Sequence, residues 1–229
     1  MSYKIIVARF QENISWLNPI MDDCVIINKG EPLNIPNEIM TENVGRESHS
    51  YLKYIIDNYD NLPDINIFTQ GNIEDHRGSN SIPYLFELGK QAHIYGKSLP
   101  ITRHESIYCT KIDSESYSNS NVWNFKIARK YDSAFDPGWN FNKKTNKWYL
   151  EDNYLNNTPI KFFDWFVKNI RKDYPNPIYI YNHAIFAVHR NNILKHPKSY
   201  YEELSLQVDH HINSTEGHFF ERSWFYIFE

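Results

Sequence analysis

The sequence has little cysteine and no long apolar run. Its two cysteines, Cys24 and Cys109, are far apart and lack the spacing of metal ligands, so neither a disulfide framework nor a zinc knuckle is indicated. No segment approaches the roughly 20 consecutive apolar residues that a membrane span needs, and the first apolar run is too short for a signal peptide. We therefore expect a soluble, cytoplasmic protein with no membrane span.

The sequence also lacks a basic run and the common nucleotide and nucleophile motifs. The formal net charge is −4 and the pI is about 6.2, with lysine and arginine scattered along the chain. This distribution does not favour nucleic acid as a partner. There is no GxGxxG, no P-loop and no GxSxG, which removes support for dehydrogenase, kinase and α/β-hydrolase functions.

No linker divides the 229 residues, so we expect a single domain over residues 1–229. Three short runs rich in β-branched residues, 4–8, 24–27 and 65–68, are typical of buried parallel strands. A polar, helix-like segment covers 11–20. From Gly45 a helix is predicted by apolar residues on one face: Tyr51, Leu52, Ile55, Ile56 and Tyr59. The order favours an α/β fold with a mixed, mostly parallel central sheet flanked by helices.

The second half of the chain continues this pattern after an interruption. Residues 110–158 are rich in Ser, Asn, Tyr and Trp without sustained periodicity, and we expect an irregular insertion there. Apolar residues return to helical spacing after Pro159, and a strand-like run follows over 178–188. Two further helices are predicted, over about 191–206 and 217–228.

Polar residues follow the first three predicted strands, and ligands in such sheets bind beyond the carboxyl ends of the strands. Arg9 and Lys29 could meet phosphate oxygens, although any exposed cation at a strand end would look the same. After the third strand come Gln70-Gly71-Asn72 and Glu74-Asp75-His76. Asp75 and His76 could hold Mg²⁺ or Mn²⁺ bridging the phosphates of a nucleotide. Alternatively, Gly71 makes a turn, Asn72 or Asp75 caps the next segment, and His76 lies on the surface.

The C-terminal helix carries a second polar group. His218, Glu221 and Arg222 lie within about one turn of each other, so that His218 and Glu221 could point into one cleft. Glu221 could act as a general base or a metal ligand, and Arg222 could bind an anion. The alternative is an amphipathic terminal helix whose glutamate and arginine form an ion pair.

A third polar group, Asp209-His210-His211, is a candidate metal site. Together with Asp75 and His76 it would suit a metal-dependent hydrolase. Adjacent residues on a helix diverge by about 100°, however, so a solvated loop is the alternative interpretation.

Several segments together resemble a poorly characterised family that is grouped with glycosyltransferases. They are Val7–Leu17, Ile27–Gly30, Asn43–His49, Asn58–Asp64, Phe68–Asn72 with Asp75 and His76, Ile185–Arg190 with Ile193 and Pro197–Tyr201, and Glu216–Trp224. The resemblance implies a GT-A-like, Rossmann-like domain in which a nucleotide-sugar lies over the first strands. It covers about residues 4–100 and 178–228, and the 110–158 insertion is unmatched.

The resemblance implies a glycosyltransferase that moves a sugar from a nucleotide-diphosphate donor to a hydroxyl acceptor on a carbohydrate or glycoconjugate, with Mn²⁺ or Mg²⁺. On this hypothesis we predict roles for ten residues: donor contacts at Arg9, Lys29, Arg46, Gln70, Gly71 and Asn72, cation ligands at Asp75 and His76, and catalysis at Glu221 and His218.

One departure from the pattern matters. Most GT-A enzymes bind the metal with an Asp-x-Asp motif, and here that place is taken by Gln70-Gly71-Asn72 or by Glu74-Asp75-His76. A catalytically silent carbohydrate- or nucleotide-binding protein of the same fold is therefore the alternative. Aromatic residues of the insertion, such as Trp139, Trp148 and Tyr149, could stack on acceptor sugars or simply pack.

Overall fold

The computed structural model describes residues 1–73, 81–95, 125–128, 139–142, 147–150, 162–173, 178–181 and 184–229. Within these residues the main sheet has five strands in the order β3-β2-β1-β4-β9. Its strands are β1 (Tyr3–Arg9), β2 (Cys24–Asn28), β3 (Glu38–Met40), β4 (Ile65–Gln70) and β9 (Phe186–His189). The first four run parallel and β9 runs antiparallel to β4. The predicted α/β class with a mixed, mostly parallel sheet is confirmed.

Alternating side chains of the central strands pack into two separate hydrophobic cores, one on each face of the sheet. Ile6 of β1 faces the same side as Phe68 of β4, whereas Ile5 and Val7 face the other side with Ile67. This period of two follows from the strand geometry, and both sides are apolar because both faces of the sheet are covered. The sheet is therefore the middle layer of three.

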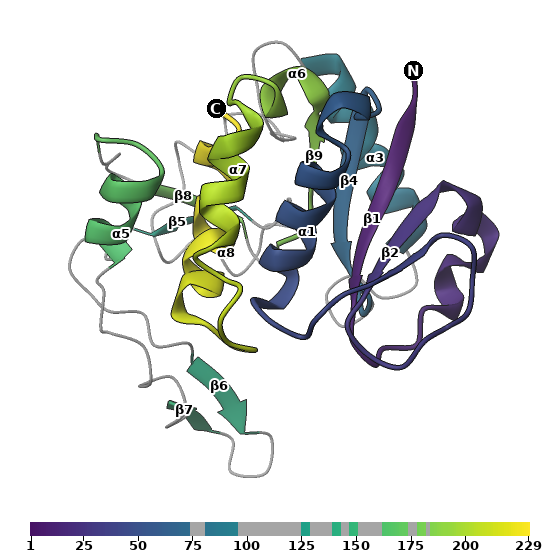
Figure 1. Ribbon diagram of the computed structural model, residues 1–229, viewed down its shortest axis with the longest axis horizontal. Coiled ribbons are helices and arrows are strands. Elements are labelled where there is room, and N and C mark those ends of the chain that lie inside the picture. Colours follow the sequence, from purple (N-terminus) through teal and green to yellow (C-terminus); the bar gives the residue numbers. More distant parts are fainter. Residues whose placement is uncertain are drawn as a thin grey trace.

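Helices cover both faces (Figure 1). Helices α1 (Arg46–Asp57), α7 (Lys198–Ser205) and α8 (Thr215–Ile227) pack on the face that carries Phe68. The 3-10 segment η1 (Ser15–Asp23) and α3 (Ser81–Tyr95) cover the opposite face. The helix α5 (Phe162–Asn169) packs against α8. Within the described ranges no helix is long and apolar enough to cross a membrane.

Aromatic rings dominate the core on the α1 side. The Tyr51 ring centroid lies 4.9 Å from that of Phe68, and Phe186 lies 5.3 Å from Trp224. All four side chains are essentially inaccessible to solvent. The Tyr51 hydroxyl donates to the Ala184 carbonyl at 2.9 Å, which satisfies its one polar atom inside this core. The contacts tie α1, β4, β9 and α8 into one unit.

The structure corrects two predicted elements. The helix predicted over 191–206 is two helices, α6 (Arg190–Ile193) and α7, because Pro197 has no N–H to continue the first and instead caps the second. The strand-like run over 178–188 is two strands in different sheets. One is β8 (Ile178–Tyr181), which pairs with β5 (Phe125–Ala128), and the other is β9.

Three further elements complete the described chain. A short 3-10 turn, η2 (Tyr59–Asn61), follows α1. Strands β6 (Trp139–Asn142) and β7 (Lys147–Leu150) pair antiparallel within the 110–158 segment. The sequence patterns did not predict β3 or α3, since β3 spans only three residues and α3 has a weakly amphipathic sequence.

Candidate functional site

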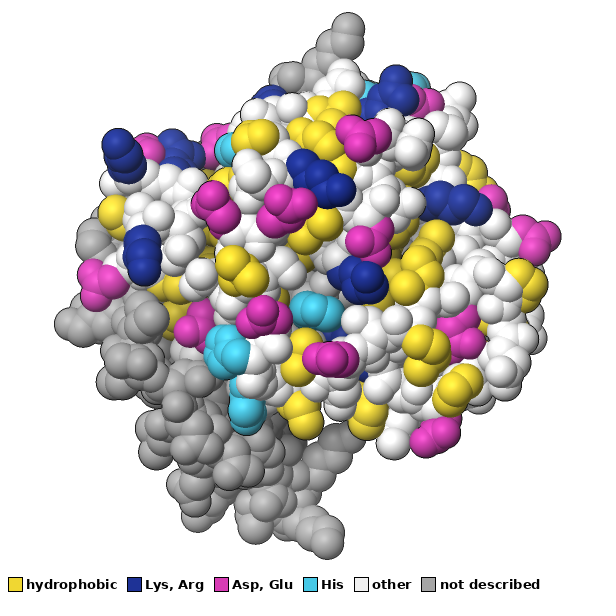
Figure 2. Space-filling view, in the orientation of Figure 1, with side chains coloured by type: hydrophobic (Ala, Val, Ile, Leu, Met, Phe, Trp, Pro, Cys, Tyr) yellow, Lys and Arg dark blue, Asp and Glu magenta, His cyan; other side chains and the backbone are white. Residues whose placement is uncertain are grey.

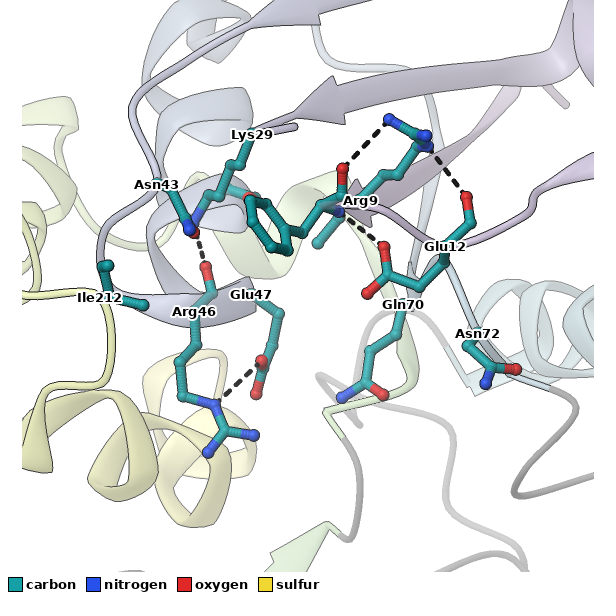
Figure 3. A pocket seen from close by; sticks show the side chains of 12 residues that line it. Arg9, Glu12, Lys29, Asn43, Arg46, Glu47, Gln70, Asn72 and Ile212 are labelled. Atoms are coloured by element: carbon teal, nitrogen blue, oxygen red, sulfur yellow. Dashed lines mark hydrogen bonds and ion pairs between the residues drawn. The ribbon is translucent and has the colours of Figure 1, made fainter. Parts of the chain in front are cut away.

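A cavity of about 310 Å³ lies beyond the carboxyl ends of β2, β1 and β4 and against the first turns of α1 (Figure 3). The lining comes from four main segments of the chain, with Ile212 on the rim. These are Ala8, Arg9, Phe10 and Glu12 at and after the end of β1, Lys29 after β2, Asn43, Arg46, Glu47 and Ser50 around the start of α1, and Gln70 and Asn72 at and after the end of β4. Its size falls within the range of small-molecule sites.

The start of α1 is held in an unusual backbone conformation. Gly45 and Arg46 have φ values of 61° and 52°, and the Gly45 N–H donates to the His211 carbonyl at 2.8 Å. A Cβ on Gly45 would lie 2.3 Å from the Val208 carbonyl oxygen. Glycine is therefore required here both by its left-handed backbone and by the close approach of the segment before α8.

Lys29 fixes this start from the sheet side. Its Nζ donates to the Val44 carbonyl at 2.5 Å and to the Arg46 carbonyl. Burial lowers the pKa of Lys29 to about 8, and the nearby Glu47 carboxylate partly offsets that effect. Two of the three N–H donors of Lys29 thus bind backbone carbonyls, and Lys29 mainly anchors the start of α1. Only its third donor is available to a ligand.

Arg9 likewise organises loops. Its Nη1 donates to the Asn28 side chain at 2.8 Å and to the carbonyls of Phe10 and Glu31, while Nε donates to the Glu12 carbonyl at 3.0 Å. In Figure 3 its guanidinium points away from the Arg46 and Glu47 side chains. The predicted phosphate contact is therefore, in this structure, a clamp that shapes the loops after β1 and β2.

Arg46 is the cation that faces both the cavity and α8. Its Nη1 lies 3.0 Å from His218 Nε2 and 3.4 Å from Asn213 Oδ1. Burial, and then the positive charges of Arg46 and Arg222, hold the pKa of His218 far below its ordinary value. His218 is therefore uncharged beside Arg46, and its Nε2 also lies 3.2 Å from Asn213 Oδ1, so that His218 and Asn213 together hold the Arg46 side chain in place.

Two other polar residues of α1 line the cavity on the same side. Glu47 is 8% exposed, and the nearest cation atom is Arg46 Nε at 3.6 Å from its carboxylate. Ser50 is 0% exposed, and its hydroxyl has no hydrogen-bond partner among the described residues. Residues three apart lie on one face of a helix, so Glu47 and Ser50 share the side of α1 that the cavity meets.

The β4 side of the cavity is built from amides and one carboxylate. Gln70 and Asn72 line it, and the carbonyl of Gly71 between them accepts from the Trp16 indole at 2.9 Å. Glu12 lies close by, because a Cβ on Gly71 would be 3.1 Å from the Glu12 Oε2. Glu12 in turn accepts from the Phe10 N–H at 2.6 Å. These contacts hold the loops after β1 and β4 together.

The structure brings together one part of the sequence-predicted site. Arg9, Lys29, Arg46, Gln70 and Asn72 all line the cavity, and Gly71 adjoins it. The two predicted catalytic residues do not line it. His218 contacts the far side of Arg46, and Glu221 lies one turn further along α8. Burial raises the pKa of Tyr51, and the charges of Glu47 and then Glu221 add to that effect.

The predicted cation ligands Asp75 and His76, with Glu74, lie outside the described residues, as do the side chains of Trp139, Trp148 and Tyr149. Among residues that the structure does describe, no group of three or more His, Cys, Asp or Glu side chains could hold a metal ion.

The His210-His211 pair diverges. His210 faces Asp209 and Glu216, with nitrogen–oxygen distances of 3.9 and 3.8 Å, whereas His211 Nδ1 accepts from the Asn213 N–H of its own loop. This is the divergence expected of neighbouring residues. In Figure 2 the face formed by α1, α7 and α8 carries acidic and basic side chains interspersed, without a large area of one sign.

Sequence reasoning did not assign Glu12, Glu47 or Ser50 to the site. The sequence did place a carboxylate and a hydroxyl close to Arg46 in the first turns of the predicted helix, which could have pointed to Glu47 and Ser50. Their burial against a cavity depends on four distant segments, which no local pattern reveals.

A family model described as a protein of unknown function, DUF3431, matches residues 5–229. The chain belongs to this family. The match includes every residue that lines the cavity. No curated protein and no solved structure matches the chain.

Proposed function

We propose that this chain is a glycosyltransferase of GT-A type, which binds a nucleotide-diphosphate sugar in the cavity and moves the sugar to a hydroxyl acceptor. The position of the cavity carries the proposal. In the order of the sheet, β2 and β3 follow β1 on one side, whereas the next strand in the sequence, β4, pairs with the other side of β1. Open α/β sheets bind nucleotides beyond the strand ends where the order reverses in this way.

The first turn of α1 gives the cavity a place for a diphosphate. Among the residues that the structure describes, no side chain caps the start of α1, and the first N–H groups of a helix have no intrahelical acceptor. Those groups and the helix dipole favour an anion. Arg46, with 36% of its side chain exposed, adds a positive charge at the same place. The diphosphate would lie between this turn and the loop after β1.

The transfer forms a bond from the acceptor oxygen to the anomeric carbon and breaks the bond from that carbon to the leaving diphosphate. An inverting transfer needs a carboxylate within hydrogen-bond distance of the acceptor hydroxyl to take its proton. Glu221 stays our prediction for this role. Because it does not line the described cavity, an acceptor would have to approach from the α8 side.

The proposed cation, Mn²⁺ or Mg²⁺, does not fit the described lining alone. The β4 side offers the amides of Gln70 and Asn72 with the single carboxylate of Glu12, whereas Mg²⁺ in nucleotide sites is usually bound by one or two carboxylates together with the phosphates. We therefore derive no step through a metal. Asp75 and His76 stay the predicted ligands.

Donor binding tests the proposal directly. Thermal shift and calorimetry with UDP-glucose, GDP-mannose and dTDP-glucose, with and without Mn²⁺, should identify at least one donor that raises the melting temperature. Arg46→Gln should weaken that donor's binding about tenfold or more. The matched control is Arg190→Gln, because Arg190 is exposed and pairs with Asp64, which directly precedes β4 and so lies at the other end of this strand from the cavity. No binding by any donor, or equal binding by both variants, would contradict the proposal.

One observation favours a second candidate, a catalytically silent nucleotide- or carbohydrate-binding protein. Neither His218 nor Glu221 lines the cavity. Donor binding without hydrolysis of the donor or transfer to a panel of mono- and disaccharide acceptors would support this candidate over the enzyme.

A further inference from the structure

We propose that Glu47 and Ser50 form a hydroxyl-binding subsite in the cavity, one that takes adjacent hydroxyl groups of a furanose or pyranose ring. The inference rests on the proposed function for the identity of the ligand. The chemistry of the subsite is inferred separately, from two buried residues that lack hydrogen-bond partners within the described part of the chain.

Glu47 is a buried carboxylate that is short of hydrogen-bond donors. Its nearest cation atom, Arg46 Nε, is at 3.6 Å, which is beyond hydrogen-bond distance, and Lys29 directs two of its donors to backbone carbonyls. A carboxylate can accept about four hydrogen bonds. Because buried polar groups are nearly always paired, an open acceptor at a cavity wall points to a ligand that donates.

Ser50 is an independent observation of the same kind. Its hydroxyl is buried with no partner among the described residues, although the residue lines the cavity one turn along α1 from Glu47. A hydroxyl both donates and accepts, as does the ring hydroxyl that it would meet. Ser48, two residues earlier, differs because its hydroxyl donates to the Gly217 carbonyl at 3.3 Å.

The local charge selects neutral donors over cations. Arg46 and Lys29 already flank Glu47, and their positive charges would repel a ligand ammonium group or a metal ion. The Glu47 carboxylate nevertheless still lacks hydrogen-bond donors among the residues that the structure describes. Ring hydroxyls supply donors without charge. Gln70 lies across the cavity, and Figure 3 shows its amide and the Glu47 carboxylate pointing the same way, away from the strands. The amide can donate to and accept from the same ring.

The hydroxyls could come from the ribose or from the transferred sugar, and ligand deletions distinguish them. Calorimetry would compare wild type, Glu47→Gln and Ser50→Ala on UDP-glucose, UDP, 2′-deoxy-UDP and 3′-deoxy-UDP, or on the corresponding guanine series if GDP-mannose is the donor that binds. We expect Glu47→Gln to weaken binding of the fully hydroxylated ligand about ten- to a hundredfold and Ser50→Ala about three- to tenfold.

An effect of Glu47→Gln on UDP-glucose that vanishes on UDP assigns the subsite to the transferred sugar. An effect on UDP that shrinks on one of the deoxy analogues assigns it to the ribose. Equal effects on all four ligands, or none, would overturn the subsite while leaving the proposed function standing. The matched controls are Glu42→Gln, at an exposed position just before α1, and Ser48→Ala, whose hydroxyl faces α8.

Failure of the proposed function gives a different pattern. If wild type binds none of the nucleotides, glucose and ribose alone would be titrated by ligand-observed NMR. Binding that Glu47→Gln abolishes would retain the subsite without the transferase, and no binding would overturn both. Circular dichroism confirms folding of each variant. If Glu47→Gln does not fold, Ser50→Ala against Ser48→Ala carries the same comparison.

Discussion

Helix α1 has two faces that differ in how completely their polar atoms are paired. On the face toward α8 and the sheet, the Tyr51 hydroxyl donates to Ala184 and the Ser48 hydroxyl to Gly217. On the cavity face, Ser50 has no partner among the described residues and Glu47 has no hydrogen bond there. A third polar atom of α1, His49 Nδ1, is also buried with no partner among the described residues, but His49 does not line the cavity. Proteins rarely leave buried polar groups open, so Glu47 and Ser50 mark the binding face because they also line the cavity.

The largest expected effect lies on the packed face. Tyr51→Ala removes a fully buried ring that contacts Phe68, Phe186 and Trp224, and should lower the free energy of unfolding by about 3–5 kcal/mol. Tyr51→Phe, which removes only the hydrogen bond to Ala184, should lower it by about 1 kcal/mol. Urea unfolding measures both. Equal losses would mean that packing on this face is not what stabilises α1.

The next effect lies where the two faces meet, at the start of α1. Gly45→Ala forces a left-handed alanine and places its Cβ 2.3 Å from the Val208 carbonyl oxygen. We expect a loss of about 2 kcal/mol or more. Gly89→Ala in α3 is the control, since its Cβ would approach side chains and not backbone, closest the Ile67 Cδ1 at 2.8 Å, with Ile65 Cγ2 at an ordinary 3.5 Å. The two melting temperatures should differ clearly, and similar values would show that the turn before α1 can relax.

A third prediction concerns acid pH. Burial, and then Lys29 and Lys53, lower the pKa of His49 on α1 to about 4. Its value in the unfolded chain is about 6.5, so only the unfolded chain binds a proton between these values, and stability should fall as pH drops from about 6.5 toward 4. Because His49 is partly exposed and solvent screens its interactions, we expect it to contribute only about 1–2 kcal/mol of that loss.

Urea unfolding at several pH values measures this slope in wild type and in His49→Gln. The variant should flatten it, while replacing the exposed His93 of α3 by Gln should leave it unchanged. A His49→Gln slope equal to that of wild type would assign the acid sensitivity to other groups, His218 foremost.

The smallest effect compares the two serines of α1. Ser48→Ala removes a made hydrogen bond and should cost about 1 kcal/mol, whereas Ser50→Ala removes an unpaired buried hydroxyl and should change stability by less than about 0.5 kcal/mol. Chemical denaturation resolves the two. A larger loss for Ser50→Ala would reveal a partner for its hydroxyl and weaken the proposed subsite.

The same contrast explains what could be predicted from the sequence. The central strands were predictable from the apolar runs 4–8, 24–27 and 65–68, because burial on both faces of the sheet leaves a continuous apolar pattern. Helix α1 was predictable from the spacing of Tyr51, Leu52 and Ile55 on its buried face. Strand β3 and helix α3 have no such pattern. The break at Pro197 divides a predicted helix that residue spacing alone favoured.

The site could be predicted from the sequence only in part. Strand-end positions placed Arg9, Lys29, Gln70 and Asn72 at one edge, because parallel strands end together. Which donors are already engaged depends on distant partners, such as the Asn28 side chain and the Glu31 carbonyl for Arg9. His218 shows the same limit, since its role behind Arg46 depends on the packing of α8 against the start of α1.

A nuclear magnetic resonance titration of the labelled protein with the donor that binds tests the central claim most directly. The account predicts amide shift changes that concentrate on residues 8–12, 29–30, 43–50 and 70–72, the segments that surround the cavity. Arg46→Gln should weaken all of them together. Shift changes confined to other segments, with these four unperturbed, would contradict a donor site at the strand ends.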